Sequence, residues 1–277
     1  MALESLRETK VPSDLSWELV VVDNNSSDDT REVVEGFKRS SGFEVQYVFE
    51  GRRGLANARN AGVMAAKGDI IGFTDDDCIV SPDWIASIAR EFMSDPSLAG
   101  IGGRVELYNR NDRPVTIRTC KERIGFLIPR QLFNLMAGCN MAFTRQVFEG
   151  VGNFDPDFGA GGKFLSSEDS DFIYRAYKKG FKIVYCPDVL VYHNHGRKTD
   201  AQVHSLNRGY VIGRGAFYCK HILGGDRDIL QLAYREVSWV TKTLIRTLFA
   251  GESIEKQRRL LRGLVTGAIS KLTNNHL

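Results

Sequence analysis

Residues 70–78 read IIGFTDDDC, an apolar segment that ends in three consecutive carboxylates. The apolar half predicts a buried strand, and the glycine and aspartate before it are a turn signal. Asp75, Asp76 and Asp77 then crowd three negative charges at the strand end, which favours a divalent cation. Because oxygen ligands suit hard cations, Mg²⁺ or Mn²⁺ is the expected metal. The alternative is a solvated acidic turn, but α/β proteins tend to bind ligands at strand ends, which favours a site.

Strand and helix signals alternate on both sides of this stretch. Strands are expected at residues 19–22, 45–49, 100–106, 138–143, 183–186 and 189–193, and helices at 30–39, 55–66, 85–93 and 166–179. This alternation predicts an α/β fold with a mostly parallel sheet and helices on both of its faces. Residues 109–131 are basic and lack clear periodicity, so either a loop or a short helix is compatible with them.

The charge is distributed unevenly along the 277 residues. Residues 1–196 carry 23 Lys and Arg against 28 Asp and Glu, whereas residues 197–277 carry 14 against 6, and the pattern from residue 202 onward is helical. This asymmetry argues against nucleic acid as a partner. It predicts an acidic α/β domain at residues 1–196 and a basic helical C-terminal extension at residues 197–277 that meets an anionic surface.

Within the extension, apolar residues recur at helical spacing between residues 220 and 250. They are Ile229, Leu230, Ala233, Val237, Val240, Leu244 and Leu248, and Lys220, Arg227, Arg235, Lys242 and Arg246 lie among them. A helix with an apolar face and basic flanks is typical of the surface of an anionic membrane. The alternative is an ordinary helix that covers the core.

Apolar run lengths and cysteines bear on the compartment. No run approaches the roughly 18 apolar residues of a membrane span, and the opening MALESLRETK is charged, unlike a signal peptide. Five cysteines without a C-x-x-C pair favour reduced thiols. We therefore expect a cytoplasmic location, with peripheral contact at the inner face of the cell membrane.

Four motifs occur in a fixed order along the chain. They are VVVDNNSSDDT, GLANARNAGVMAAKGDIIGFTDDDC, GCNMAFTRQVFEGVGNFD and SSEDSDFIYRAYKKGFKIVYCPDVLVYHNHG. Together they resemble the family 2 glycosyltransferases with the GT-A fold, over roughly residues 17–196. The resemblance implies a nucleotide-sugar donor, a divalent metal and inversion at the anomeric carbon. It also implies a saccharide or lipid-linked acceptor, in the synthesis of cell-surface polysaccharide or glycoconjugate.

The resemblance departs from the family at its start. Members usually begin with a strand of the type apolar-apolar-Pro-Thr-Tyr-Asn-Arg, which helps to hold the nucleotide, whereas this chain opens on ALESLRETKVPSD. We expect the lack of that strand to expose apolar surface and unpaired backbone, and to weaken the nucleotide pocket.

The D-x-D motif of the family matches Asp75 and Asp77, which implies that one or both bind the metal that bridges the donor diphosphate. The cation would neutralise charge on the departing nucleotide, and Asp76 would lie near the ribose. The family often has a histidine near the metal at the position of His193 and His195. Two residues apart on a strand, these side chains point the same way, and neutral imidazole suits Mn²⁺. The alternative is two solvated histidines.

Four further residues are implied in donor binding by the resemblance. Asp23 and Asn24 correspond to the position that reads the nucleobase, although they also suit an Asx-turn, and the two roles are compatible. Arg59 is placed near the nucleotide, where its forked donors suit phosphate, with a surface arginine as the alternative. Asn140 belongs to the matching GCNMAF segment.

The family places the catalytic base in an acidic pair, here Glu168 and Asp169, of which Asp169 matches best. An inverting transfer needs a carboxylate to accept the acceptor hydroxyl's proton, and a helix N-terminus keeps such a group ionised. A structural alternative exists, because Ser166 and Asp169 resemble a capping box, and Asp171 and Arg175 are spaced to pair.

Two other functions remain compatible with the sequence. A nucleotidyltransferase also has acids at a strand end, but its glycine-rich G-x-G-T-R loop is absent. A catalytically impaired GT-A-like pseudoenzyme or partner subunit would explain the missing first strand. Metal-dependent binding of a nucleoside diphosphate would argue against the latter.

Overall fold

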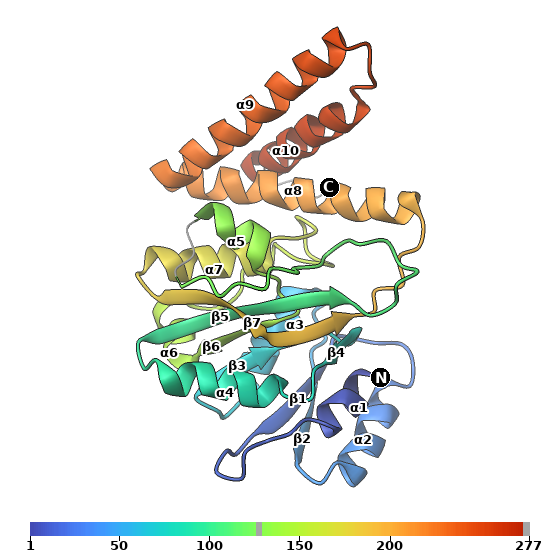
Figure 1. Cartoon of the computed structure of the whole chain (residues 1–277), viewed down its shortest axis with the longest axis vertical. Coiled ribbons are helices and arrows are strands. Elements are labelled where there is room, and N and C mark those ends of the chain that lie inside the picture. The colour runs from blue at the N-terminus through green and yellow to red at the C-terminus, as the bar shows by residue number, and fades with distance from the viewer. Residues whose placement is uncertain (126–128, 274–277) are drawn as a thin grey trace.

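The computed structural model describes residues 1–125 and 129–273 and shows an α/β body with three long helices stacked on one side (Figure 1). The elements of the body are α1 (Ala2–Arg7), β1 (Glu18–Asp23), α2 (Thr30–Ser40), β2 (Glu44–Phe49), α3 (Leu55–Ala65), β3 (Ile70–Phe73), β4 (Cys78–Val80), α4 (Trp84–Ser94), β5 (Leu98–Leu107), α5 (Pro129–Leu135), β6 (Met141–Thr144), α6 (Arg145–Val151), α7 (Glu168–Lys178) and β7 (Lys182–His193). The long helices are α8 (Asp200–Leu223), α9 (Arg227–Phe249) and α10 (Glu255–Thr273). The α/β class and the helical C-terminal part are confirmed.

The strands form two sheets. β1 and β2 pair in parallel, and a five-stranded sheet has the order β3-β6-β5-β7-β4. In that sheet only β5 and β7 are parallel, so the expectation of a mostly parallel sheet was wrong in this respect and the sheet is mixed. A connection that contains a helix permits parallel pairing but does not require it. β6 runs antiparallel to both β3 and β5, and β4 runs antiparallel to β7, although helices lie between the strands of each pair along the chain.

Two predicted segments differ from the structure. The strands expected at residues 183–186 and 189–193 are one continuous strand, β7, whose register against β5 shifts between Gly103 and Arg104. The unassigned segment 109–131 includes residues 126–128, which lie outside the described part of the chain, and it ends inside α5.

A deep groove separates β1 from β3. It has a volume of about 1110 Å³, and β1, β3, α3 and α4 all contribute to its lining. Among the described strands, β1 pairs only with β2 and β3 only with β6, so each strand has a free edge. Gly72 in the middle of β3 is exposed, which is unusual for the interior of an α/β body. The acidic turn after β3 lies along the same groove.

A cluster of aromatic rings fixes α7 against the sheet. Phe172 of α7 is fully buried and stacks on Phe154 and Phe148, with ring centroids 4.4 and 4.9 Å apart, and it meets Phe143 of β6 edge-on at 5.1 Å. Such contacts add to the burial of large apolar surfaces. The first turn of α7, which carries the predicted base, is therefore held rigidly.

The three C-terminal helices pack on the α7 side of the body (Figure 1). α8 begins with a complete capping box between Thr199 and Gln202. α10 lies so close to α8 that a Cβ atom on Gly267 would come within 1.9 Å of the Ile212 carbonyl oxygen, so glycine is required there. Within the described ranges, none of the helices combines the length and apolar character that crossing a bilayer requires.

Candidate active site

The acidic turn lines the groove together with residues from two other segments. Asp75, Asp76 and Asp77 line it, as do Asp23 at the end of β1, the adjacent Asn24 and Arg59 of α3. The structure therefore brings six of the predicted site residues to one cleft, although they are up to 54 positions apart in the sequence.

Arg59 links the acidic turn to α7. Its side chain is buried, and its Nη1 donates to Glu168 Oε1 at 2.6 Å while Nη2 lies 3.5 Å from Asp75 Oδ1. The alternative of a surface arginine is wrong. A Cβ atom on Gly138 would come within 2.5 Å of the guanidinium, so glycine leaves the space that Arg59 occupies. Sequence reasoning missed Gly138, because its role depends on a residue 79 positions away.

Asp169 lies beside this ion pair at the start of α7. Its Oδ2 accepts a hydrogen bond from the Gly138 backbone N–H at 2.9 Å, and its Oδ1 accepts one from the Ser170 N–H at 2.6 Å. The capping-box alternative is wrong: the N-cap residue is Ser167, without a side-chain cap, and Ser166 Oγ donates to the Gly209 carbonyl instead. Asp169 is thus oriented by two backbone amides rather than engaged as a reciprocal cap.

The pKa of Glu168 is raised although its carboxylate pairs with Arg59. Burial, followed by the charge of Asp169, raises the pKa of Glu168 to about 7 against the opposing pull of Arg59. Burial likewise raises the pKa of Asp75, again opposed by Arg59. One buried guanidinium therefore faces three carboxylates, which is a deficit of positive charge at this end of the groove.

Asp77 and His193 form the second part of the site. His193 Nε2 lies 3.1 Å from Asp77 Oδ2, and its Nδ1 lies 2.9 Å from Thr116 Oγ1. The Thr116 hydroxyl donates to the Val115 carbonyl at 2.6 Å, so its oxygen accepts from Nδ1–H. Nε2 is then the ring nitrogen that faces Asp77, where it either donates to the carboxylate or, without a proton, shares a cation with it.

A divalent metal fits these donors. One ligand atom each from Asp77, Cys78 and His193 lies within 4.8 Å of the others. Burial would raise the pKa of Asp77, but the hydrogen bond and charge of His193 outweigh burial and lower it, which keeps the carboxylate ionised. Carboxylate and imidazole suit Mn²⁺, and the buried Cys78 thiol is a softer donor.

The structure places His195 differently from His193. Its side chain is fully buried, its Nδ1 lies 3.8 Å from Asp112 Oδ2 and accepts from the Arg197 N–H at 3.0 Å, and its Nε2 has no hydrogen-bond partner among the described residues. It is not brought to Asp77, unlike its neighbour. The solvated-histidine alternative is wrong for both, because His193 is also buried.

Asp23 and Asn24 hold the loops at the mouth of the groove. Asp23 accepts from the Ser26 N–H at 2.8 Å, which is the expected Asx-turn, and from the Tyr47 hydroxyl at 2.6 Å. The Tyr47 hydrogen bond is the main cause of the lowered pKa of Asp23. Asn24 accepts from the Gly54 N–H at 2.7 Å, so it positions the start of α3.

Asn140 lies inside the body. It is fully buried; its Oδ1 accepts from Trp84 Nε1 at 2.9 Å, and its Nδ2 donates to the carbonyls of Arg104 and Val189 at 2.8 and 2.9 Å. All its side-chain hydrogen-bonding groups are used within the protein. It therefore braces α4, β5 and β7 behind the site.

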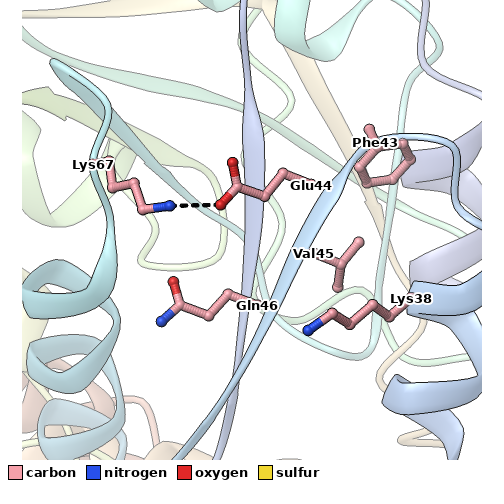
Figure 2. A pocket seen from close by; sticks show the side chains of 6 residues that line it. All are labelled: Lys38, Phe43, Glu44, Val45, Gln46 and Lys67. Carbon is pink, nitrogen blue, oxygen red and sulfur yellow. Dashed lines mark hydrogen bonds and ion pairs between the residues drawn. The ribbon is translucent and has the colours of Figure 1, made fainter.

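A smaller hollow of about 450 Å³ lies elsewhere, where Lys38, Phe43, Glu44, Val45, Gln46 and Lys67 line it (Figure 2). An ion pair of 2.6 Å joins Lys67 to Glu44 across it. It contains none of the predicted site residues and lacks the convergent carboxylates of the groove.

An α/β body with a carboxylate turn at a strand end, facing an acidic helix N-terminus, defines the GT-A glycosyltransferase fold, and solved structures agree. The mannosyltransferase PcManGT from Pyrobaculum calidifontis, in complex with GDP-Man and Mn²⁺, matches with a TM-score of 0.63 and 20% identity, over 99% of this chain and 83% of that one. Residues 1–349 of S. aureus TarS, in complex with UDP-GlcNAc, match with a TM-score of 0.55 and 15% identity, over 99% and 87%. At these identities the likeness shows the fold.

Sequence comparison gives the family. The profile of Glycosyl transferase family 2 matches residues 2–152, and the chain belongs to this family. It is 27% identical over 197 residues to glucosyl-dolichyl phosphate glucuronosyltransferase of Haloferax volcanii, covering 68% of this chain and 61% of that protein. It is 26% identical over 176 residues to poly-beta-1,6-N-acetyl-D-glucosamine synthase of Staphylococcus aureus, covering 61% and 41%. The chain therefore spans less than two thirds of either relative.

Proposed function

We propose that this chain is a metal-dependent inverting glycosyltransferase, which moves a sugar from a nucleotide-sugar donor to a saccharide or lipid-linked acceptor. The observation that carries the proposal is the contact between His193 Nε2 and Asp77 Oδ2, which lie 3.1 Å apart next to the other carboxylates of the acidic turn. A divalent cation held by these groups would offset the excess of negative charge and would in turn bind the donor diphosphate. The nucleotide sugars bound by PcManGT and TarS support the donor class.

Asp77 and His193 are the proposed metal ligands, and Asp75, whose Oδ1 lies 3.5 Å from Arg59 Nη2, would act on a bound diphosphate only through that metal. When bound, Mn²⁺ or Mg²⁺ would supply Lewis-acid stabilisation of the leaving nucleoside diphosphate. Asp76, which is exposed at the turn, is proposed to lie near the ribose, and Asp23 near the nucleobase. Asn24, Asn140 and His195 would act indirectly, by holding the surrounding loops and strands.

Asp169 is the proposed general base. Two backbone amides fix its orientation, and the first turn of α7 favours the ionised form. It would accept the proton of the acceptor hydroxyl as that oxygen attacks the anomeric carbon from the face opposite the leaving nucleotide. Glu168 keeps Arg59 in place beside it, so its role is to position rather than to receive the proton.

The proposed acceptor and location draw on what the names of the relatives specify. The names of the two curated relatives specify a dolichyl phosphate-linked sugar and a polysaccharide, which support a lipid-linked or saccharide acceptor in cell-surface glycan synthesis. A cytoplasmic location with peripheral contact at the inner face of the cell membrane completes the proposal.

A donor screen tests the proposal. The full chain is incubated with UDP- and GDP-sugars and a saccharide or lipid-phosphate acceptor, with Mn²⁺, with Mg²⁺ and with a chelator, and nucleotide release is matched to product mass. We expect release only with a divalent cation, and a product of inverted anomeric configuration. Absence of both transfer and cation-dependent nucleotide binding would instead favour the catalytically impaired subunit, with which the free edges of β1 and β3 among the described strands are compatible.

A further inference from the structure

The exposed side of α9 is unusually apolar. Leu230, Tyr234, Val237, Ile245 and Leu248 are all exposed, and at about 100° per residue they fall within roughly a quarter of the helix circumference. At the end of the helix Phe249 is 90% exposed. A large aromatic side chain left in water at a helix end, next to an apolar stripe, indicates a surface that another phase or molecule covers.

The side of α9 next to the stripe accounts for its attachment to the body. Ile229 and Val240 are fully buried, so part of the predicted apolar face does pack on the core. Leu230, Val237 and Leu248, which belong to the same predicted set, do not. The alternative of a helix that covers the core therefore accounts for only part of α9, because its apolar residues cover more of the circumference than the body buries.

Positive charge follows one flank of the stripe. Arg227, Arg235, Lys242 and Arg246 are exposed and form no ion pair with any residue in the described ranges. The acids of the helix are engaged elsewhere, since Asp228 pairs with Lys178 at 3.1 Å and Glu236 with Arg214 at 2.8 Å. The outward side of α9 thus carries unopposed cations beside apolar side chains.

We propose that α9 docks on an anionic lipid bilayer, with the stripe from Leu230 to Leu248 and the terminal Phe249 inserted at the headgroup boundary and the basic flank on the phosphates. An apolar stripe beside Lys and Arg is the composition of interfacial helices, and anionic headgroups attract each surface cation. The last turn of α9 also lies at the end of the molecule farthest from the two sheets (Figure 1), where it can reach a flat surface without obstruction.

A second copy of the chain fits this surface less well. A two-fold interface places the same patch on both subunits, so the four basic residues of one copy would face those of the other without acids to oppose them. A bilayer rich in anionic lipid supplies the negative charge that these basic residues lack, and it buries the apolar stripe at the same time. The proposal concerns attachment alone and does not depend on the transferase activity.

Co-sedimentation of the full chain with vesicles tests the proposal. Vesicles of phosphatidylcholine and phosphatidylglycerol at about 3:1 are compared with pure phosphatidylcholine, at about 0.05 and 0.5 M salt. We expect strong pelleting with the anionic vesicles at low salt, and at least a tenfold weaker apparent affinity at high salt or without phosphatidylglycerol. Equal binding to both vesicle types, or no binding to either, overturns the proposal.

Matched variants assign the surface. Tyr234→Ser with Phe249→Ser removes apolar contacts, and Arg235→Gln with Lys242→Gln removes charge; all four side chains are exposed, so the fold is retained, which circular dichroism verifies. Each pair should weaken vesicle binding about tenfold or more.

Control variants distinguish binding through this surface from non-specific binding of the protein to vesicles. Met93→Ser and Lys38→Gln alter an apolar and a basic residue that are equally exposed but lie on α4 and α2. Unchanged binding of these controls is expected. If they weaken binding as much as the α9 variants, or if the α9 variants bind as the unmodified chain does, α9 is not the docking surface. A dimer by light scattering that the α9 variants convert to monomer, without vesicle binding, would assign the stripe to a second copy and overturn the bilayer.

Discussion

Two acidic clusters lie on one helix, three residues apart, and they differ in how their charge is balanced. Asp171 is completely buried and meets two cationic groups, Arg175 Nε at 2.8 Å and Lys220 Nζ at 2.7 Å, and it also contacts His221 Nε2 at 3.0 Å. Burial alone would raise the pKa of Asp171, but these partners outweigh burial and lower it. Glu168 shares one guanidinium with Asp75, and its pKa is raised to about 7.

This difference in charge balance distinguishes a structural cluster at Asp171 from a candidate functional cluster at Glu168 and Asp169. At Asp171 every charge has its partner within the chain, and the cluster ties α7 to α8 without needing a ligand. At Glu168 and Asp169 the negative charge exceeds what Arg59 supplies, and carboxylates with perturbed pKa values are typical of functional sites. Four experiments test this difference between the two clusters.

The largest expected effect is on turnover. Asp169→Asn should reduce sugar transfer by ~10²–10⁴-fold, because the amide keeps the shape but cannot accept a proton. Nucleotide affinity in the presence of Mn²⁺ and the melting temperature should stay close to those of the unmodified chain, since the Gly138 N–H can still donate to the side-chain carbonyl. Steady-state kinetics, calorimetry and thermal melting on the same protein give the three values.

The result for Glu168→Gln decides between the two acids. Normal turnover of Asp169→Asn together with a comparable loss in Glu168→Gln would assign the base to Glu168. Retained activity in both would place the base outside α7 and remove the functional half of the contrast.

The next effect is on stability. Asp171→Asn should lower the free energy of unfolding by about 3–5 kcal/mol, because it leaves buried cationic groups without their carboxylate. Chemical denaturation measures this change. Asp228→Asn is the matched control: that carboxylate pairs with Lys178 at the surface, and its loss should have little effect. Equal stability of the two variants would show that the Asp171 cluster is not the structural one.

The third effect appears in the pH dependence. The pKa of Glu168 is higher in the folded chain, about 7, than the ordinary 4.5, so its ionisation opposes folding. The unmodified chain should therefore lose stability as pH rises from about 4.5 to 7, by on the order of 3 kcal/mol. Glu168→Gln cannot ionise and should lack this decline, so its advantage in melting temperature should grow with pH. Parallel profiles without metal or nucleotide would contradict the raised pKa.

The smallest effect is on metal-dependent binding. Asp77→Asn should weaken the Mn²⁺-dependent affinity for UDP or GDP by about 10–100-fold, as loss of an oriented ligand group does. Isothermal titration calorimetry measures it. Asp76→Asn, on the exposed middle acid of the turn, should change the affinity less. Unchanged affinity of the Asp77 variant would remove that residue from the metal site.

Local structure was largely predictable from the sequence, since strand and helix periodicity depends on neighbouring residues. The strands and helices around the acidic turn, and the pairing of Asp171 with Arg175 over one helical turn, follow from spacing alone. The expectation of a mostly parallel sheet was wrong, because the signals for strands and helices do not specify the path of the chain between strands, and that path decides the direction of each strand.

Long-range contacts were beyond such reasoning. The sequence left a surface position open for Arg59, because the acids that hold it in the interior are 16 and 109 positions away. His193 and His195 are two residues apart, and this spacing predicts the same direction for both side chains. Thr116, which lies in a segment without recognisable periodicity, orients only His193 toward Asp77. The capping box at Ser166 failed because Ser167, at a positive φ of 77°, is the N-cap residue in its place.

The groove between β1 and β3 has a consequence for local opening. The carbonyl of Asp23 accepts from the Glu50 N–H toward β2, so alternation along β1 directs the backbone of Val20 and Val22 to the groove. These amides lack a ladder partner and should exchange with solvent far faster than those of β5 and β7. The unit of β1, α2 and β2 would then open without the rest of the body, and its free edge would be where chains associate when they are concentrated.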